Sequence, residues 1–345
     1  MDFAQAQGQA KALRPKTDGP SGGPYTVNEA ADDYLEYLRG EGRGDAAIGD
    51  AKYRIDAFIR PSLGKFEVVT LSVDQLRRWR SGLAKGAARL RTKAGEKQKH
   101  RETTDERARQ SSANRILTTL KAMLNYAFDE EKVASNKAWG RRLKPFENAD
   151  AARVRYLEIT EAKRLSNACD DDFGRLVYGA LQSGGRYGQL AALRVSDFNS
   201  DVDTIDFRSR KGRGKEKVYS CVLTDEGARF FKQVCAGRAR NDLIFTQDGE
   251  PWGKGHQVRL MEEACKQATI KPKIGFHILR HTWASHAVMN GTPLMVVAKN
   301  MGHTDTRMVE KHYGHLAPSY VADAIQAGAP RFGFKPSNVK PMRGL

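Results

Sequence analysis

A run of apolar side chains at helical spacing is the sequence feature that most narrows what this chain can fold into. Its members recur three and four positions apart and therefore fall on one face of an α-helix. They are Ile116, Leu117, Leu120, Met123, Leu124, Ala127 and Phe128. A helix with one apolar face depends for its stability on other elements that cover that face. The run therefore predicts a bundle of helices around it.

Three segments upstream supply the other helices of this bundle. Thr26 and Glu29 form a capping box, which marks the start of a helix. A second apolar stripe stops at Pro61, which should end its helix, and a third helix begins at Ser72. The stripes are Val27, Tyr34, Leu35 and Leu38, then Ile48, Ile55, Phe58 and Ile59, then Leu76, Trp79 and Leu83. We predict a four-helix domain over residues 25–137, preceded by a flexible polar tail over residues 1–24.

A strongly basic segment lies between the third and fourth predicted helices. Residues 85–109 contain nine Lys or Arg against four Asp or Glu, with almost no large apolar side chain to bury. Such a segment is either a solvated, mobile loop or an arm along a DNA backbone, where each neutralised phosphate releases counterions. Charge alone does not choose between these two interpretations.

A linker and a second domain follow. Residues 138–154 lose the apolar period and contain Gly140, Pro145 and a run of Asn, Asp and Ala, which is typical of a linker. Helices are predicted over residues 160–168 and 173–182 and from residue 224 onward. Strand-like patterns over residues 202–207 and 218–223, on either side of two glycines, predict a small β-hairpin. We assign residues 155–328 to this domain and residues 329–345 to a C-terminal tail.

The charge balance indicates what kind of partner the chain binds. Lys and Arg total 58 against 41 Asp and Glu, so the net charge is +17 and the pI about 9.7, which favours a polyanion. The mean hydropathy is −0.61, and no run approaches 18 apolar residues, so we expect no membrane partner. The four cysteines form no C-x-x-C pair and residues 1–24 hold no signal-like apolar run, so we expect a reducing cytoplasm.

Six of the eight histidines lie between residues 277 and 315, which makes this segment the place to look for a site. On a helix, His277 would share a face with Arg280 and with His281. The two histidines could bind a metal, but Ile278 stands where H-E-x-x-H needs Glu, and Arg280 would repel a dication. We therefore expect no metal site.

Several motifs, taken in their order along the chain, resemble the tyrosine recombinase (phage integrase) family. They are an Arg within Ser183 to Leu190, a lysine on the predicted hairpin, H-x-x-R-H-T from residue 277, Gly-His at 302–303, and a tyrosine ten positions later. The resemblance covers residues 155 to about 320, and the helical first domain resembles the family's core-binding domain. It implies a mainly α fold with a small β-hairpin, in which two domains clamp duplex DNA.

The resemblance also implies a catalytic set: Arg186, Lys211, His277, Arg280, His303 and Tyr313. Tyr313 would attack the phosphodiester, while the two arginines would bind its non-bridging oxygens bidentately. The phenol must lose a proton and the leaving 5′ hydroxyl must gain one, for which His277 is the candidate base and Lys211 the candidate acid. Lys215 and Lys217 on the same turn stay open as alternatives for the acid. His303 would donate a hydrogen bond to the phosphate.

One departure from the family pattern concerns the position three after the first arginine, where Gln189 replaces the usual Glu. The implied activity is site-specific recombination for integration or excision of a mobile element, through a 3′-phosphotyrosine link that needs no cofactor. The implied partners are double-stranded DNA, a homotetramer in a synapse, and accessory DNA-bending proteins. A type IB topoisomerase or a DNA-binding regulator with a decayed active site are the alternatives.

Overall fold

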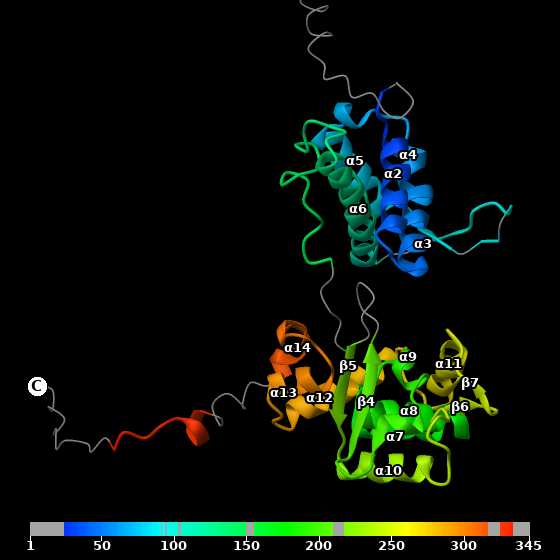
Figure 1. The fold of residues 1–345 in the computed structure, drawn as a ribbon, viewed down its shortest axis with the longest axis vertical. Helices are drawn as coiled ribbons and strands as arrows, with labels where there is room; N and C mark the ends of the chain where they lie inside the picture. The colour runs from blue at the N-terminus through cyan, green and yellow to red at the C-terminus, as the bar shows by residue number, and fades with distance from the viewer. Residues whose placement is uncertain are drawn as a thin grey trace, which may run out of the picture. The chain divides into compact units, whose positions relative to one another are not determined.

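A computed structural model describes residues 24–90, 92–93, 95–102, 105–149, 155–209, 217–316 and 325–333. The chain divides into two compact units, Met1–Ala151 and Ala152–Leu345, each with its own core (Figure 1). Helices dominate both units, so the prediction of a mainly α chain with small sheets is confirmed. Within the described residues, no helix is both long enough and apolar enough to cross a membrane.

The first unit is a bundle built around the long helix that carries the apolar run. Its helical elements are α2 (Val27–Gly40), α3 (Asp45–Arg54), η1 (Ile55–Ile59), α4 (Arg60–Leu63), η2 (Val68–Thr70), α5 (Val73–Lys85) and α6 (Glu106–Asp129). The capping box at Thr26 is present, and the Ser72 hydroxyl caps α5 by accepting from the Gln75 N–H. Leu76, Leu120 and Leu124 lie fully buried in the core.

The predicted stop at Pro61 is wrong, because the helix continues past it to Leu63. The chain turns through a π-helical segment, η1, and Pro61 then occupies the second position of α4. Proline is tolerated in a first helical turn, where its missing N–H would have little use. The consequence is that Pro61 has no N–H to give the carbonyl of Ala57.

The segment that follows α6 packs against the bundle. Trp139 and Leu143 are buried in the core of the first unit. The Trp139 indole N–H donates to Asn125 at 2.9 Å, and Lys121 donates to the carbonyls of Gly140 and Leu143, each at 3.1 Å. These contacts attach residues 139–143 to α6.

The second unit places helices around a three-stranded antiparallel sheet of order β3-β4-β5. Its helical elements are α7 (Ile159–Asn167), α8 (Asp171–Ser183), α9 (Tyr187–Leu190), η3 (Val195–Asp197), α10 (Asp225–Cys235), α11 (Gln257–Gln267), α12 (His277–Met289), α13 (Leu294–Asn300), α14 (Arg307–Tyr313) and η4 (Gly314–Leu316). The strands are β3 (Phe198–Asn199), β4 (Thr204–Ser209) and β5 (Lys217–Val222), with a separate pair β6 (Thr246–Gln247) and β7 (Glu250–Pro251). The predicted hairpin is confirmed as β4 and β5, whereas β3, β6 and β7 were not predicted.

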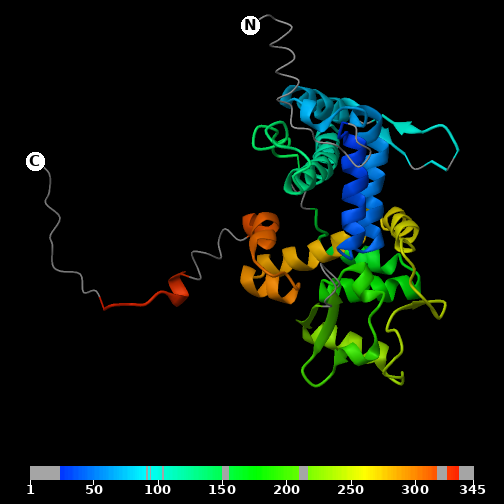
Figure 2. The ribbon, with the colours of Figure 1, turned by 45° about the horizontal axis from the view of Figure 1, so that its top comes forward.

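Helices α12, α13 and α14 gather at one side of the second unit, as both views show (Figures 1 and 2). They share a small core, which includes Ala284, Val288, Val297, Met301 and Tyr313. This core brings α14 against α12, the helix that carries the H-x-x-R-H sequence.

Candidate active site

Helix α12 carries three of the polar residues singled out from the sequence. His277 and His281 lie on one face as predicted, with ring centroids 4.9 Å apart. Burial lowers the pKa of His277, and the neighbouring cations Arg280 and Arg186 lower it further. His277 is therefore a neutral imidazole at physiological pH, able to accept a proton.

Arg280 is buried, with 3% of its surface exposed. Its Nη1 donates to the Gly184 carbonyl at 2.7 Å, and its Nη2 donates to the Met301 carbonyl at 2.7 Å. Nη2 also lies 3.1 Å from His303 Nε2. One guanidinium thus joins the end of α8 to the end of α13 and places His303 beside itself.

Arg186 is the N-cap residue of α9 and lies two positions after Gly184, whose carbonyl accepts from Arg280. Its charge also lowers the pKa of the Arg280 guanidinium, after burial. Two cations held close together repel each other, and an anion bound near both would offset this repulsion. The pair therefore forms a site suited to an anion such as phosphate.

Gln189 connects Arg186 to the β-hairpin. Its amide oxygen accepts from the Arg186 backbone N–H at 3.3 Å and from the Tyr219 hydroxyl at 3.2 Å. Its amide nitrogen donates to the Arg208 carbonyl on β4 at 3.3 Å. A carboxylate could not make this last bond because it has no donor, so glutamine at this position adds a tie between α9 and the sheet.

Tyr313 ends α14 and is 3% exposed. Its hydroxyl lies 2.6 Å from His281 Nδ1, and burial raises the pKa of the phenol to about 12. Burial also lowers the pKa of His281 to about 4, with His277 and His312 as further causes. Neutral His281 and the protonated phenol thus share a hydrogen bond, a contact that the sequence did not predict.

The Asn300 side chain at the end of α13 is hydrogen-bonded to β5 of the β-hairpin. Asn300 accepts from the Val222 N–H at 2.7 Å and donates to the Val222 carbonyl at 3.2 Å. Of the three candidate lysines, Lys211 and Lys215 lie outside the described residues, whereas Lys217 is exposed at the start of β5. The lysine of the predicted set therefore stays a prediction.

Two further observations concern metal ligands and a pocket elsewhere in the second unit. Among the described residues, no group of three or more His, Cys, Asp and Glu side chains could hold a metal ion.

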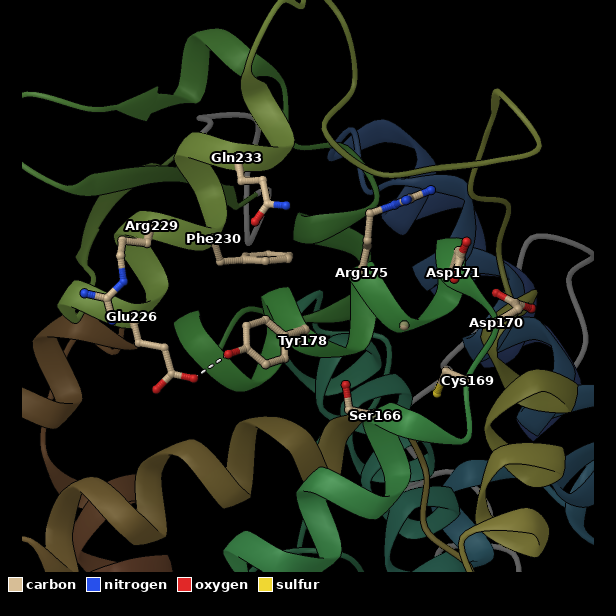
Figure 3. A pocket seen from close by; sticks show the side chains of 11 residues that line it. Ser166, Cys169, Asp170, Asp171, Arg175, Tyr178, Glu226, Arg229, Phe230 and Gln233 are labelled. Carbon is tan, nitrogen blue, oxygen red and sulfur yellow. Dashed lines mark hydrogen bonds between the residues drawn. The ribbon is translucent and has the colours of Figure 1, made fainter.

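A separate pocket of about 610 Å³ lies where α7, α8 and α10 meet, beside Cys169, Phe230 and the hydrogen-bonded pair Tyr178 and Glu226 (Figure 3). None of the five predicted site residues that the structure describes lines it.

Comparison with known proteins places this site in a family. Residues 155–319 match the model of the phage integrase family. The integrase of Escherichia phage 186 is 28% identical over 195 residues, which are 53% of this chain and 52% of that protein. The integrase of Salmonella phage P22 is 28% identical over 181 residues, 50% of this chain and 46% of that protein. The chain thus spans about half the length of these relatives.

Solved structures share the fold. The Tn1549 transposon integrase in complex with a circular intermediate DNA has a TM-score of 0.66 at 15% identity and covers 88% of this chain and 99% of its own. A lambda integrase tetramer bound to a Holliday junction has a TM-score of 0.63 at 16% identity and covers 87% of this chain and 86% of its own. At these identities the likeness shows the fold.

Proposed function

The chain belongs to the tyrosine recombinase family, and on that premise we propose that it is a site-specific DNA recombinase that cuts and rejoins duplex DNA through a 3′-phosphotyrosyl intermediate. Its proposed task is the integration or excision of a phage or other mobile element in the cytoplasm. The observation that carries the proposal is the pair Arg186 and Arg280, which lies in the same cluster as a tyrosine hydroxyl and four imidazoles, those of His277, His281, His303 and His312.

The arginine pair is suited to a scissile phosphate. In-line attack on a phosphodiester concentrates charge on its two non-bridging oxygens, and planar guanidinium groups match such oxygens. Arg280 is already fixed by two carbonyls, so little reorganisation is needed when the phosphate arrives. His303 beside it would donate a further hydrogen bond to the phosphate.

Tyr313 is the proposed nucleophile. Its Oη forms a bond to phosphorus while the bond from phosphorus to the 5′ oxygen breaks, so the phosphodiester energy is kept in a tyrosyl ester and religation needs no nucleotide or metal. The phenolic proton must go to a base, and the 2.6 Å contact makes His281 a second candidate base beside His277. The leaving 5′ oxygen would take a proton from Lys211, with Lys215 and Lys217 as alternatives.

The proposed partners follow from this chemistry. Recombination exchanges strands between two duplexes, each cut once on each strand, so the complete reaction needs four nucleophiles. We propose a homotetramer on duplex DNA, assisted by accessory DNA-bending proteins. The lambda integrase structure, a tetramer on a Holliday junction, supports this arrangement.

Covalent capture tests the proposal and also finds the unknown target. Purified protein is incubated in EDTA with nicked duplexes prepared from genomic fragments that include the gene and its flanks. SDS-resistant protein–DNA complexes are then recovered and sequenced. The proposal expects one recurrent sequence joined to the protein through a 3′ end, and none with Tyr313→Phe. The absence of any covalent complex, or equal recovery with the Phe variant, would overturn it.

A further inference from the structure

The basic segment between α5 and α6 forms a short antiparallel hairpin in the described residues. We call the described residues between 86 and 102, which are 86–90, 92–93 and 95–102, the hairpin arm. Its strands are β1 (Ala88–Arg89) and β2 (His100–Arg101), and the Leu90 N–H extends the pairing by donating to the Lys99 carbonyl at 2.9 Å. In both views the arm projects away from the helices of the first unit (Figures 1 and 2).

The base of the hairpin arm is attached to the bundle by Arg89. Its Nη1 donates to the Ala57 carbonyl at 3.2 Å. This carbonyl receives no helical hydrogen bond from Pro61, because proline has no N–H. Its Nη2 donates to Gln98 at 2.6 Å, and its guanidinium lies 5.5 Å from the centre of the Phe58 ring. The Gln98 amide in turn donates to carbonyls on both sides of the hairpin. These bonds fix the direction in which the arm leaves the bundle.

The hairpin arm is cationic, and the side chains of Lys93, Lys97, Lys99 and Arg101 are exposed. Residues 86–102 contain six Lys or Arg against two Glu. Lys99 lies 3.4 Å from Glu96, an exposed pair of small energetic worth. Among the described residues, no acidic side chain pairs with Lys93, Lys97 or Arg101. Like charges gathered on a fixed projection repel one another, and a polyanion that binds there removes this cost.

We propose that the hairpin arm binds the sugar–phosphate backbone of duplex DNA, independently of sequence, through Lys93, Lys97, Lys99 and Arg101. Because it concerns the same duplex, this inference rests on the proposed function. A phosphate backbone offers a regular row of anions along which several side chains of one projection can act together. The arm would therefore add affinity and salt dependence, while recognition of the target sequence stays with other parts of the chain.

The test measures binding of the full chain to a duplex of unrelated sequence as a function of salt. In the arm variant, Lys93, Lys97, Lys99 and Arg101 are replaced by Gln. If two to four phosphates are engaged, the slope of log K against log salt becomes less negative by about 2 to 4, and affinity at 0.1 M salt falls about 50-fold or more. The control variant carries the same change of charge at exposed positions of the same unit, namely Arg39→Gln, Arg43→Gln, Lys132→Gln and Lys137→Gln.

The control separates local contact from net charge. The proposal expects the slope of the control variant to stay within about 1 of the wild-type slope. Equal losses in the two variants, or an unchanged slope in the arm variant, would overturn it. The assay needs no cleavage, so it gives an answer whether or not the protein forms a covalent complex.

Discussion

Replacing Gly302 with alanine tests how closely the β-hairpin approaches the end of α13. Gly302 has φ of +69°, directly before His303. An added Cβ would lie 2.4 Å from Cε1 of the Tyr219 ring, a distance that forces the ring or the backbone to move. Either movement displaces His303 or the Tyr219 hydroxyl that reaches Gln189.

The expected cost has two parts. The left-handed conformation costs an alanine about 1–2 kcal/mol, and overpacking against the ring adds about 1–3 kcal/mol. We therefore expect Gly302→Ala to lower the free energy of unfolding of the second unit by about 2–5 kcal/mol, within the stability of an ordinary domain. Urea unfolding measures this loss, and a covalent-capture assay should show slower cleavage by the folded fraction.

Gly237→Ala is the matched control for this prediction. Gly237 has nearly the same φ, +70°, but nothing within 4 Å of the added Cβ, so it should lose only the conformational part. Removing the ring with Tyr219→Ala should likewise reduce the added cost of Gly302→Ala to about 1–2 kcal/mol. If Gly302→Ala costs no more than Gly237→Ala, the close contact with Tyr219 carries no energy and the reasoning is refuted.

Three further predictions concern the site itself. Arg280→Lys should slow covalent complex formation about 100-fold or more, because one ammonium cannot replace a fixed guanidinium, while DNA affinity measured by filter binding changes only a few-fold. As the pH falls from 6.5 to about 4, the unfolded chain protonates His281 and the folded chain does not, so stability should fall in that window; thermal melts of His281→Gln should fall less. Cleavage should be unchanged by EDTA, and restoration of a lost activity by Mg²⁺ or Zn²⁺ would revive a metal role for His277 and His281.

Local spacing predicted those parts of the site that lie on one helix. His277, Arg280 and His281 share a face because residues three and four apart always do so on an α-helix. The contact between His281 and Tyr313 spans 32 positions and depends on how α14 packs against α12, which no local pattern encodes. The same holds for Asn300, whose partner Val222 is 78 positions away.

The fold shows the same division between local and distant effects. Capping at Thr26 and Ser72 and the period of α6 predicted helices correctly, because each depends on neighbouring residues. Pro61 was expected to end a helix, but the π-helical segment η1 lies directly before α4, and the chain stays helical past Pro61 to Leu63. An arm was one of two interpretations of the segment before α6, but its paired strands and its attachment were not predicted, because the anchor Arg89 finds its acceptor 32 positions away at Ala57.

The identity of the residue that becomes joined to DNA tests the central claim most directly. After covalent capture, nuclease and trypsin digestion should leave one peptide, residues 312–331, which contains both Tyr313 and Tyr320 because no Lys or Arg interrupts it. Fragmentation in a mass spectrometer then assigns the bound nucleotide. We expect it on Tyr313, linked through a 3′ phosphate; a nucleotide on Tyr320, or on any other residue, would contradict the account of this site.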